Sequence, residues 1–229
     1  MLLLFDIDGT LVERTAAYHH ALALFDAIEQ VWERDVRGHR VEAAGRTDPE
    51  ITRALLLADG ATDAEVDGGL AAFSDVVVQR YAQIIPDSLA HELLPGAAAV
   101  LEELARDETM RLALVTGNLE GIARLKLGAA GVGQHFEHGQ GAFGSDSEDR
   151  LHLPPIARLR AGRAWGGGEP WPRERTVVIG DTPRDIACAR ADGVHVVCVT
   201  TGSYGADELA EADVVIGSFD ELGAALAPF

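Results

Sequence analysis

The fold is decided by the stretch LLLFDIDGT at residues 2–10. It begins with an apolar run, Leu2 to Phe5, which stops abruptly at the carboxylate of Asp6. An uninterrupted apolar run, without polar alternation, is typical of a strand that is covered on both faces of its sheet. Similar runs recur as RLALVT at residues 111–116, as TVVIGD at residues 176–181, and more briefly at residues 194–199 and 213–216.

Helical segments separate these predicted strands. Residues 96–106 and 118–130 carry apolar residues at helical spacing, and residues 183–191 open with a proline, which suits the first turn of a helix. Strands that alternate with helices indicate an α/β fold, a doubly wound parallel sheet with right-handed crossovers.

Residues 13–92 interrupt this alternation, because they contain no convincing strand. Residues 51–58 and 70–85 are also expected to be helical. The first helix is expected to present one apolar face, made of Ala21, Phe25, Ile28 and Trp32. We therefore predict a core domain of residues 1–12 and 93–229 with an all-helical domain of residues 13–92 inserted into it. An insert that directly follows a strand would lie over the edge where such sheets bind ligands.

Charge and composition exclude several kinds of partner. The 229 residues include 19 Lys and Arg against 37 Asp and Glu, for a formal net charge of −18. Such a chain is repelled by nucleic acids and by anionic membranes, so we expect neither as a partner. Cys188 and Cys198 are too few for a disulfide scaffold. With no signal peptide or apolar run of membrane-spanning length, we expect a cytoplasmic protein, either a monomer or a homodimer.

Polar residues cluster where three of the predicted strands end. The clusters are Asp6-Ile7-Asp8-Gly9-Thr10, Thr116-Gly117-Asn118 and Gly180-Asp181-Thr182-Pro183-Arg184-Asp185. Any one of them alone is better explained as helix capping. Together they bring four carboxylates to one edge of the sheet, which is costly unless a cation neutralises them. Hard oxygen ligands of this kind suit Mg²⁺.

These clusters resemble the first, second and fourth motifs of the haloacid dehalogenase superfamily of phosphohydrolases. Order, spacing and strand context agree over nearly the whole chain. The resemblance implies a HAD-like Rossmannoid core and identifies the helical insert as a cap domain of the first type. Gly45-Arg46-Thr47-Asp48 is similar to a cap segment of phosphoglycolate-phosphatase-like members. Arg46 and Thr47 are thereby candidate substrate contacts, although Arg46 could equally form a surface ion pair.

The same resemblance implies a role for each residue of the clusters. Asp6 would be the nucleophile that forms an aspartyl-phosphate, and Asp8 the general acid and later the general base. Thr116 would bind the phosphoryl group, helped by Gly117 and Asn118. Mg²⁺ would be held by Asp6, the Asp8 carbonyl and Asp181, with Asp185 as a direct or outer partner. The implied activity is hydrolysis of a small phosphorylated metabolite, with phosphoglycolate as the first candidate.

The third motif departs from the family's pattern. The family usually places a lysine there, but residues 144–155, GSDSEDRLHLPP, contain none. Arg150 is the best substitute because it precedes a helix that opens with proline, and Arg158 is the second candidate. The simpler interpretation of Arg150 is a surface pair with Asp146 or Asp149.

Other interpretations remain open. A phosphosugar mutase of the same superfamily would share the acidic residues, and a signalling domain that holds phosphate on aspartate would use a similar cluster. A haloacid dehalogenase proper is disfavoured because that branch lacks an acid at the position of Asp8. The GxGxxG match at residues 139–144 is weak evidence for a dinucleotide site, as are His135 and His138 for zinc. The segment 161–173 is expected to be an exposed loop, whose Trp165 and Trp171 could instead pack on a neighbour.

Overall fold

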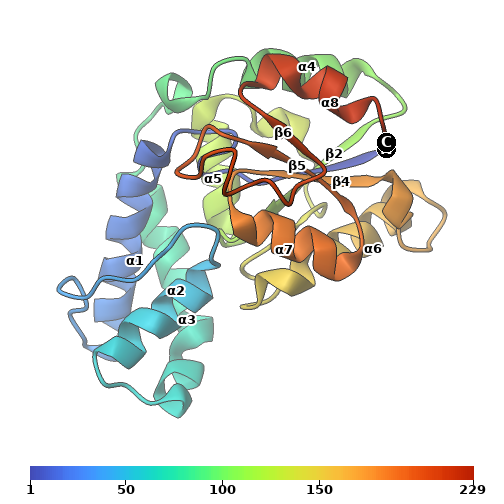
Figure 1. Cartoon of the computed structure of the whole chain (residues 1–229). Coiled ribbons are helices and arrows are strands. Elements are labelled where there is room, and N and C mark those ends of the chain that lie inside the picture. The colour runs from blue at the N-terminus through green and yellow to red at the C-terminus, as the bar shows by residue number, and fades with distance from the viewer.

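The six strands of the computed structural model form one parallel sheet, and the structure describes all of residues 1–229. They are β1 (Leu2–Phe5), β2 (Arg111–Thr116), β3 (Ala142–Phe143), β4 (Thr176–Gly180), β5 (His195–Val199) and β6 (Val214–Ile216). Their order is β3-β2-β1-β4-β5-β6, so β1 lies between β2 and β4 (Figure 1). Phe5 pairs with Leu114 on one side and Ile179 on the other, which places the ends of β1, β2 and β4 at one edge.

Helices cover both faces of this sheet, as the continuous apolar runs predicted. The core helices are α4 (Ala97–Arg106), α5 (Glu120–Ala130), α6 (Leu153–Trp165), α7 (Pro183–Asp192) and α8 (Leu222–Leu226). Leu3 and Phe5 of β1 belong to the apolar cluster under α4, α5 and α8. Leu2 and Leu4 belong to the cluster under α6 and α7. Alternate side chains of one fully buried strand thus serve two cores, and the doubly wound α/β prediction is confirmed.

Three further helices lie between β1 and β2 in sequence and form a separate helical body beside the sheet edge (Figure 1). They are α1 (Ala17–Trp32), α2 (Asp48–Ala58) and α3 (Asp63–Ile84). Their own apolar core includes Ile28, Leu55 and Phe73, and it is joined by Leu119 and Ile122 from the α5 region. No helix of the protein combines the length and apolar character that a membrane crossing requires.

Several predicted boundaries and faces were wrong in detail. The buried face of α1 contains Ala23, Leu24, Ala27 and Ile28, whereas Ala21 is exposed. The helix α3 starts at Asp63, seven residues earlier than the predicted 70, because Thr62 and Glu65 form a capping box. The short strand β3 and the helix α8 were not predicted, since runs of two and five residues carry almost no periodic signal.

The segment 161–173 is only partly a loop. Helix α6 continues to Trp165, and the loop then folds back over Gly162, where a Cβ would lie 1.8 Å from the carbonyl oxygen of Glu169. Trp165 and Trp171 are partly buried against the protein's own core cluster under α6 and α7. The tryptophans therefore already have a packing partner within the chain.

Candidate active site

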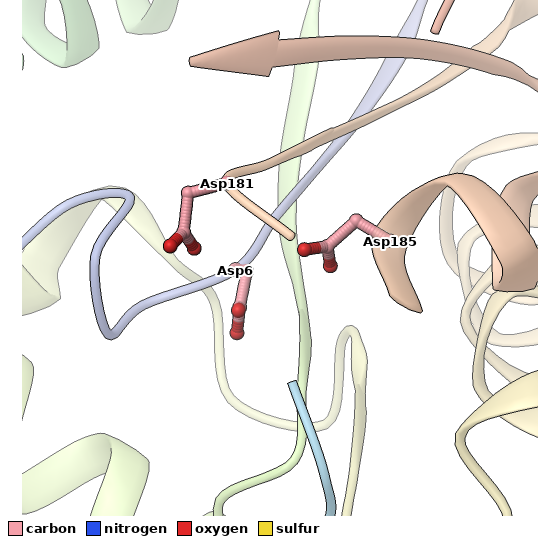
Figure 2. Close-up of side chains that lie close together, drawn as sticks. All are labelled: Asp6, Asp181 and Asp185. Carbon is pink, nitrogen blue, oxygen red and sulfur yellow. The ribbon is translucent and has the colours of Figure 1, made fainter. Parts of the chain in front are cut away.

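Three buried aspartates converge at the edge where β1 and β4 end. Asp6 follows β1, Asp181 follows β4, and Asp185 lies in the first turn of α7. One carboxylate oxygen from each lies within 4.8 Å of the others, and Figure 2 shows the three side chains close together. The backbone N–H of Asp6 donates to the carbonyl of Ile179 at 2.9 Å, so the sheet ladder itself holds the first aspartate.

Glycines make room for the Asp181 carboxylate. A Cβ on Gly9 would lie 2.3 Å from Asp181 Oδ2, and a Cβ on Gly202 would lie 1.7 Å from the same atom. Gly9 also has φ of +87°, which side chains of L residues rarely adopt. The hydroxyl of Thr10 donates to Asp181 Oδ1 at 3.1 Å. The DxDGT sequence therefore supplies the carboxylate of Asp6. Its glycine and threonine also give Asp181 space and a hydrogen bond.

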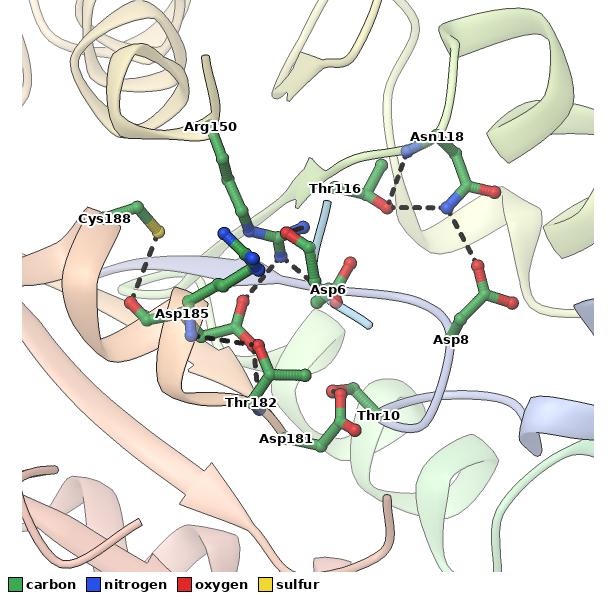
Figure 3. Close-up of polar contacts among 12 residues, drawn as sticks. Asp6, Asp8, Thr10, Thr116, Asn118, Arg150, Asp181, Thr182, Asp185 and Cys188 are labelled. Atoms are coloured by element: carbon green, nitrogen blue, oxygen red, sulfur yellow. Dashed lines mark hydrogen bonds and ion pairs between the residues drawn. The ribbon is translucent and has the colours of Figure 1, made fainter. Parts of the chain in front are cut away.

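Arg150 provides the positive charge beside this cluster. Its Nη2 lies 2.5 Å from Asp185 Oδ1 and 3.1 Å from Asp6 Oδ2, and its side chain is buried (Figure 3). The predicted alternative of a surface pair with Asp146 or Asp149 does not occur, because Asp146 pairs with Arg160. Arg158 lies elsewhere, in a buried pair with Asp192. Of the two arginines considered, only Arg150 reaches Asp6.

Asp185 is already fully engaged by the protein. Its Oδ1 accepts from Arg150, and its Oδ2 accepts from the backbone N–H of Thr182 at 3.0 Å and the Thr182 hydroxyl at 2.8 Å. This is the capping box of α7. Asp6 and Asp181 keep more of their oxygen lone pairs free than Asp185 does. They are therefore the better direct ligands for a cation.

Negative charge exceeds positive charge in this cluster. Burial raises the pKa of Asp6 to about 6, although Arg150 opposes the shift. Burial also raises the pKa of Asp181 to about 8, and the charges of Asp185 and Asp6 add to the effect. Three carboxylates with a single guanidinium leave a buried site that favours either protons or a metal cation. The residues present thus fit a hard divalent cation such as Mg²⁺.

Asp8 lies in a different environment, on the opposite side of Asp6 from this cluster. Lys126 Nζ of α5 lies 2.7 Å from both Oδ1 and Oδ2 of Asp8. Asn118 Nδ2 donates to Oδ2 at 2.8 Å. Burial alone would raise the pKa of the Asp8 carboxyl, but Lys126 and the hydrogen bonds lower it below its ordinary value.

The segment after β2 arranges the remaining predicted phosphoryl contacts. Thr116 is fully buried, and its Oγ1 accepts from the Asn118 backbone N–H at 3.3 Å and from Asn118 Nδ2 at 3.0 Å (Figure 3). Its own hydroxyl proton is donated to no protein acceptor. Gly117 packs so tightly under the cap that a Cβ there would lie 2.0 Å from the carbonyl oxygen of Arg46.

A cavity of about 540 Å³ joins this site to the cap. Asp6, Asp8 and Asp181 line it from the core. The cap contributes four arginines to the lining, together with two histidines and one acid: Arg14, Arg37, Arg40, Arg46, His20, His39 and Asp48. The cap therefore faces the core carboxylates with an excess of basic side chains, around a half-open volume that can admit a small anion.

Two predicted cap contacts differ in their placement. Arg46 forms the predicted ion pair, 3.4 Å from Glu50, and it also lines the cavity, so that its contact with a substrate stays a prediction. Thr47 is fully buried and does not line the cavity. Its hydroxyl donates to the Glu148 carbonyl at 2.7 Å and caps α2 by accepting from Glu50 N–H. The structure thus gives Thr47 a capping position rather than a substrate contact.

Sequence reasoning missed two site residues. Lys126 is the single lysine of the chain, and this was the only feature of the sequence that could have drawn attention to it. His20 of α1 is buried and lies 3.2 Å from Asp48. Asp48 in turn accepts from the Leu119 N–H at 2.8 Å, linking the cap to the segment after β2.

Comparison with known proteins agrees with this geometry. Residues 3–190 match the haloacid dehalogenase-like hydrolases. Phosphoglycolate phosphatase of Mesorhizobium japonicum is 31% identical over 99% of this chain and 94% of its own length. The tyrosine-protein kinase PtkA of Mycobacterium tuberculosis is 31% identical over 98% of this chain and 72% of its own. The crystal structure of β-phosphoglucomutase from Clostridium difficile shares the fold, with a TM-score of 0.67 at 16% identity over 97% of this chain and 95% of its own. This chain therefore belongs to the haloacid dehalogenase-like hydrolase family, as an enzyme of the phosphatase type that resembles the phosphoglycolate phosphatases.

Proposed function

We propose that this protein is a Mg²⁺-dependent phosphatase that hydrolyses a small phosphate monoester through an aspartyl-phosphate on Asp6. The observation that carries the proposal is the placement of Asp6 and Asp8 on one cavity, each beside its own cation. Arg150 serves the first carboxylate and Lys126 the second. Two aspartates with different neighbours on one cavity can act as a nucleophile and a separate acid–base group.

In the first step, an Asp6 carboxylate oxygen attacks phosphorus, and the bond from phosphorus to the leaving oxygen breaks. Asp8, in its protonated form, gives its proton to that oxygen, and the alcohol leaves. Arg150 and the hydroxyl of Thr116 would stabilise the equatorial phosphoryl oxygens. The expected N–H donors of Gly117 and Asn118 would act on the same oxygens.

In the second step, Asp8 takes a proton from a water molecule, whose oxygen attacks phosphorus. The bond to Asp6 breaks, inorganic phosphate leaves, and Asp8 is again protonated for the next cycle. The cap closes the cavity over Asp6, which limits the access of other water molecules to the acyl-phosphate.

Mg²⁺ would be held by Asp6, Asp181 and the backbone carbonyl of Asp8, with Asp185 as an outer partner because its oxygens are taken by Arg150 and Thr182. When bound, it would offset the repulsion between an anionic carboxylate and an anionic phosphate. This assignment follows from the excess of buried carboxylates over cations at the strand ends.

Phosphoglycolate is the first substrate to test. Arg14 and Arg40 line the cavity and form no ion pair within 4.0 Å, so they are free to meet a second anionic group. A phosphate ester that also bears a carboxylate matches this lining. Relatives that are 31% and 32% identical carry the name phosphoglycolate phosphatase, which supports the same choice.

The test is phosphate release by the purified protein from phosphoglycolate, sugar phosphates and p-nitrophenyl phosphate, with Mg²⁺ and with a chelator. We expect Mg²⁺-dependent release that Asp6→Asn reduces by on the order of 10⁴-fold or more, since loss of a nucleophile removes the covalent route. No release from any ester, or full activity of Asp6→Asn, would overturn the proposal.

Three other outcomes point to a different activity. Isomerisation of a sugar phosphate without release identifies a mutase. A long-lived phosphoryl group on Asp6 without release identifies a signalling domain. Transfer of phosphate from ATP to a tyrosine peptide, with no ester hydrolysis, identifies a kinase.

A further inference from the structure

Lys126 occupies a position that the phosphatase chemistry above leaves unexplained. It is the only lysine among the 19 Lys and Arg residues of the chain. Its side chain is fully buried in α5, although burying an ammonium group is costly unless every N–H finds a partner. A buried charge at this cost needs a compensating contact.

The ammonium of Lys126 finds all of its partners at one carboxylate and one amide. It donates to Asp8 Oδ1 and Oδ2, both at 2.7 Å, and to Asn118 Oδ1 at 2.9 Å. These contacts match its three N–H groups. Neither Asp6 nor Asp185 is within ion-pair distance of Lys126. Both of these carboxylates pair with Arg150 instead.

Asp8 contacts its cation on the side that faces away from the cavity. Its side chain is 24% exposed and lines the cavity, whereas Lys126 behind it is 0% exposed and does not line the cavity. Lys126 therefore cannot contact a substrate in this arrangement. What it can do is set the direction in which the Asp8 carboxylate faces the cavity.

We infer that Lys126 is a positioning residue for Asp8, which holds this carboxylate where it can protonate the leaving oxygen of a phosphate ester. The inference rests on the proposed function, since it assigns Lys126 a part in the same reaction. Proton transfer requires the acid within hydrogen-bond distance of the leaving oxygen, and a displacement of about 1 Å can cost on the order of 100-fold in rate.

Leaving-group dependence separates positioning from a structural role. An alkoxide must be protonated as it leaves, whereas dinitrophenolate is stable as an anion and leaves without help. For Lys126→Met we expect kcat/KM to fall by roughly 30- to 100-fold for an alkyl phosphate and by less than about threefold for 2,4-dinitrophenyl phosphate. Because kcat/KM covers only the steps up to aspartyl-phosphate formation, the later role of Asp8 as a base does not blur the comparison. An equal loss for both esters would overturn the inference.

Arg158→Met is the matched control. It also removes one member of a buried ion pair, the one with Asp192, but away from the cavity. We expect a comparable loss of thermal stability and kcat/KM within about threefold of wild type for both esters. In an Asp8→Asn background, Lys126→Met should add less than about threefold further loss, since its effect passes through Asp8. A full additional loss in that background would contradict the inference.

A second measurement remains valid if Lys126→Met fails to fold. Because the chain has one lysine, ¹⁵N-lysine labelling gives a single side-chain resonance that needs no assignment. Asp8→Asn should shift it clearly, and Arg158→Met should leave it in place. An unmoved resonance in Asp8→Asn would overturn the inference. Absence of ester hydrolysis by the wild type would instead overturn the proposed function, while this resonance would still test the contact.

Discussion

The two sides of the proposed catalytic centre, which we name by the proposed roles of Asp6 and Asp8, balance their charges in opposite ways. The nucleophile side consists of Asp6, Asp181, Asp185 and Arg150, three carboxylates against one cation. The acid–base side consists of Asp8, Lys126 and Asn118, one carboxylate against one cation. Accordingly, the pKa values of Asp6 and Asp181 are raised and that of Asp8 is lowered. The first side keeps an excess of negative charge that protons or a metal cation can neutralise, whereas the single carboxylate of the second is balanced by Lys126.

The largest expected effect comes from removing the one cation of the nucleophile side. In Arg150→Met, Asp6 and Asp185 lose their shared guanidinium, and the transferring phosphoryl group loses a positive charge. We expect kcat/KM to fall by roughly 10²- to 10³-fold at saturating Mg²⁺, equally for alkyl and dinitrophenyl phosphates. The equal loss would contrast with the leaving-group dependence expected of Lys126→Met.

A loss of less than about tenfold in Arg150→Met would break the comparison, because the nucleophile side would then draw its positive charge from elsewhere. Arg158→Met again serves as the control for burial, since its ion pair lies outside the cavity.

The pair Arg150 and Arg158 also shows what the sequence could and could not predict. Both are buried and paired with an aspartate, and they lie eight residues apart. Local sequence favoured Arg150 through its place before a helix. Only the contacts with α7 show which arginine belongs to the site. Arg150 meets Asp185 near the start of this helix, and Arg158 meets Asp192 at its end.

The sheet and the three acidic clusters were predictable for a different reason. Continuous apolar runs report burial on both faces, and a carboxylate directly after such a run must lie at the sheet edge. Lys126 was not predictable in this way, because it lies on a helix face whose partner comes from residue 8. The prediction that Thr47 contacts a substrate overlooked a second signal. A threonine directly before a helix is typical of an N-cap, and Thr47 caps α2.

The second prediction concerns the stability of the metal-free nucleophile side. The folded state raises the Asp181 pKa to about 8, so ionisation of this carboxyl is disfavoured by folding. The resulting penalty grows as the pH rises from the ordinary aspartate value toward about 8. Asp181→Asn removes it, and we expect the free energy of unfolding in a chelator to increase by about 1–3 kcal/mol near neutral pH, measured with urea.

The gain in Asp181→Asn should shrink at about pH 5, because this pH lies closer to the ordinary aspartate pKa and the unfolded carboxyl then loses less by taking up a proton on folding. A gain of the same size at both pH values would show that charge is not its cause. We expect Asp181→Asn to be inactive at both pH values. The Asp181 carboxylate would then lower the stability of the metal-free protein while serving the proposed reaction.

The third prediction concerns competition between protons and metal on the same side. A bound cation displaces the proton that Asp181 carries below its pKa of about 8. Below about pH 6 the cation also displaces a proton from Asp6, whose pKa is about 6. We therefore expect Mg²⁺ affinity to rise by up to about tenfold for each pH unit between about 6 and 8. Calorimetry in buffers of different ionisation enthalpy would detect the released proton. Affinity independent of pH would contradict the expectation, and Asp181→Asn should abolish both the slope and the proton release.

The smallest expected effect tests the acid–base side through its neutral member. Asn118 donates to Asp8 and Thr116 and accepts from Lys126. In Asn118→Ala, Lys126 still contacts both oxygens of Asp8, so we expect kcat/KM for an alkyl phosphate to fall by only about 3- to 10-fold. Asn118→Asp keeps the acceptor for Lys126 but places a second carboxylate beside Asp8, where the two compete for one ammonium. We expect kcat/KM to be lower for Asn118→Asp than for Asn118→Ala, because a site whose charges already balance tolerates a missing hydrogen bond better than an added negative charge. If Asn118→Asp were instead the more active of the two, the acid–base side would carry spare positive charge, and its contrast with the nucleophile side would fail.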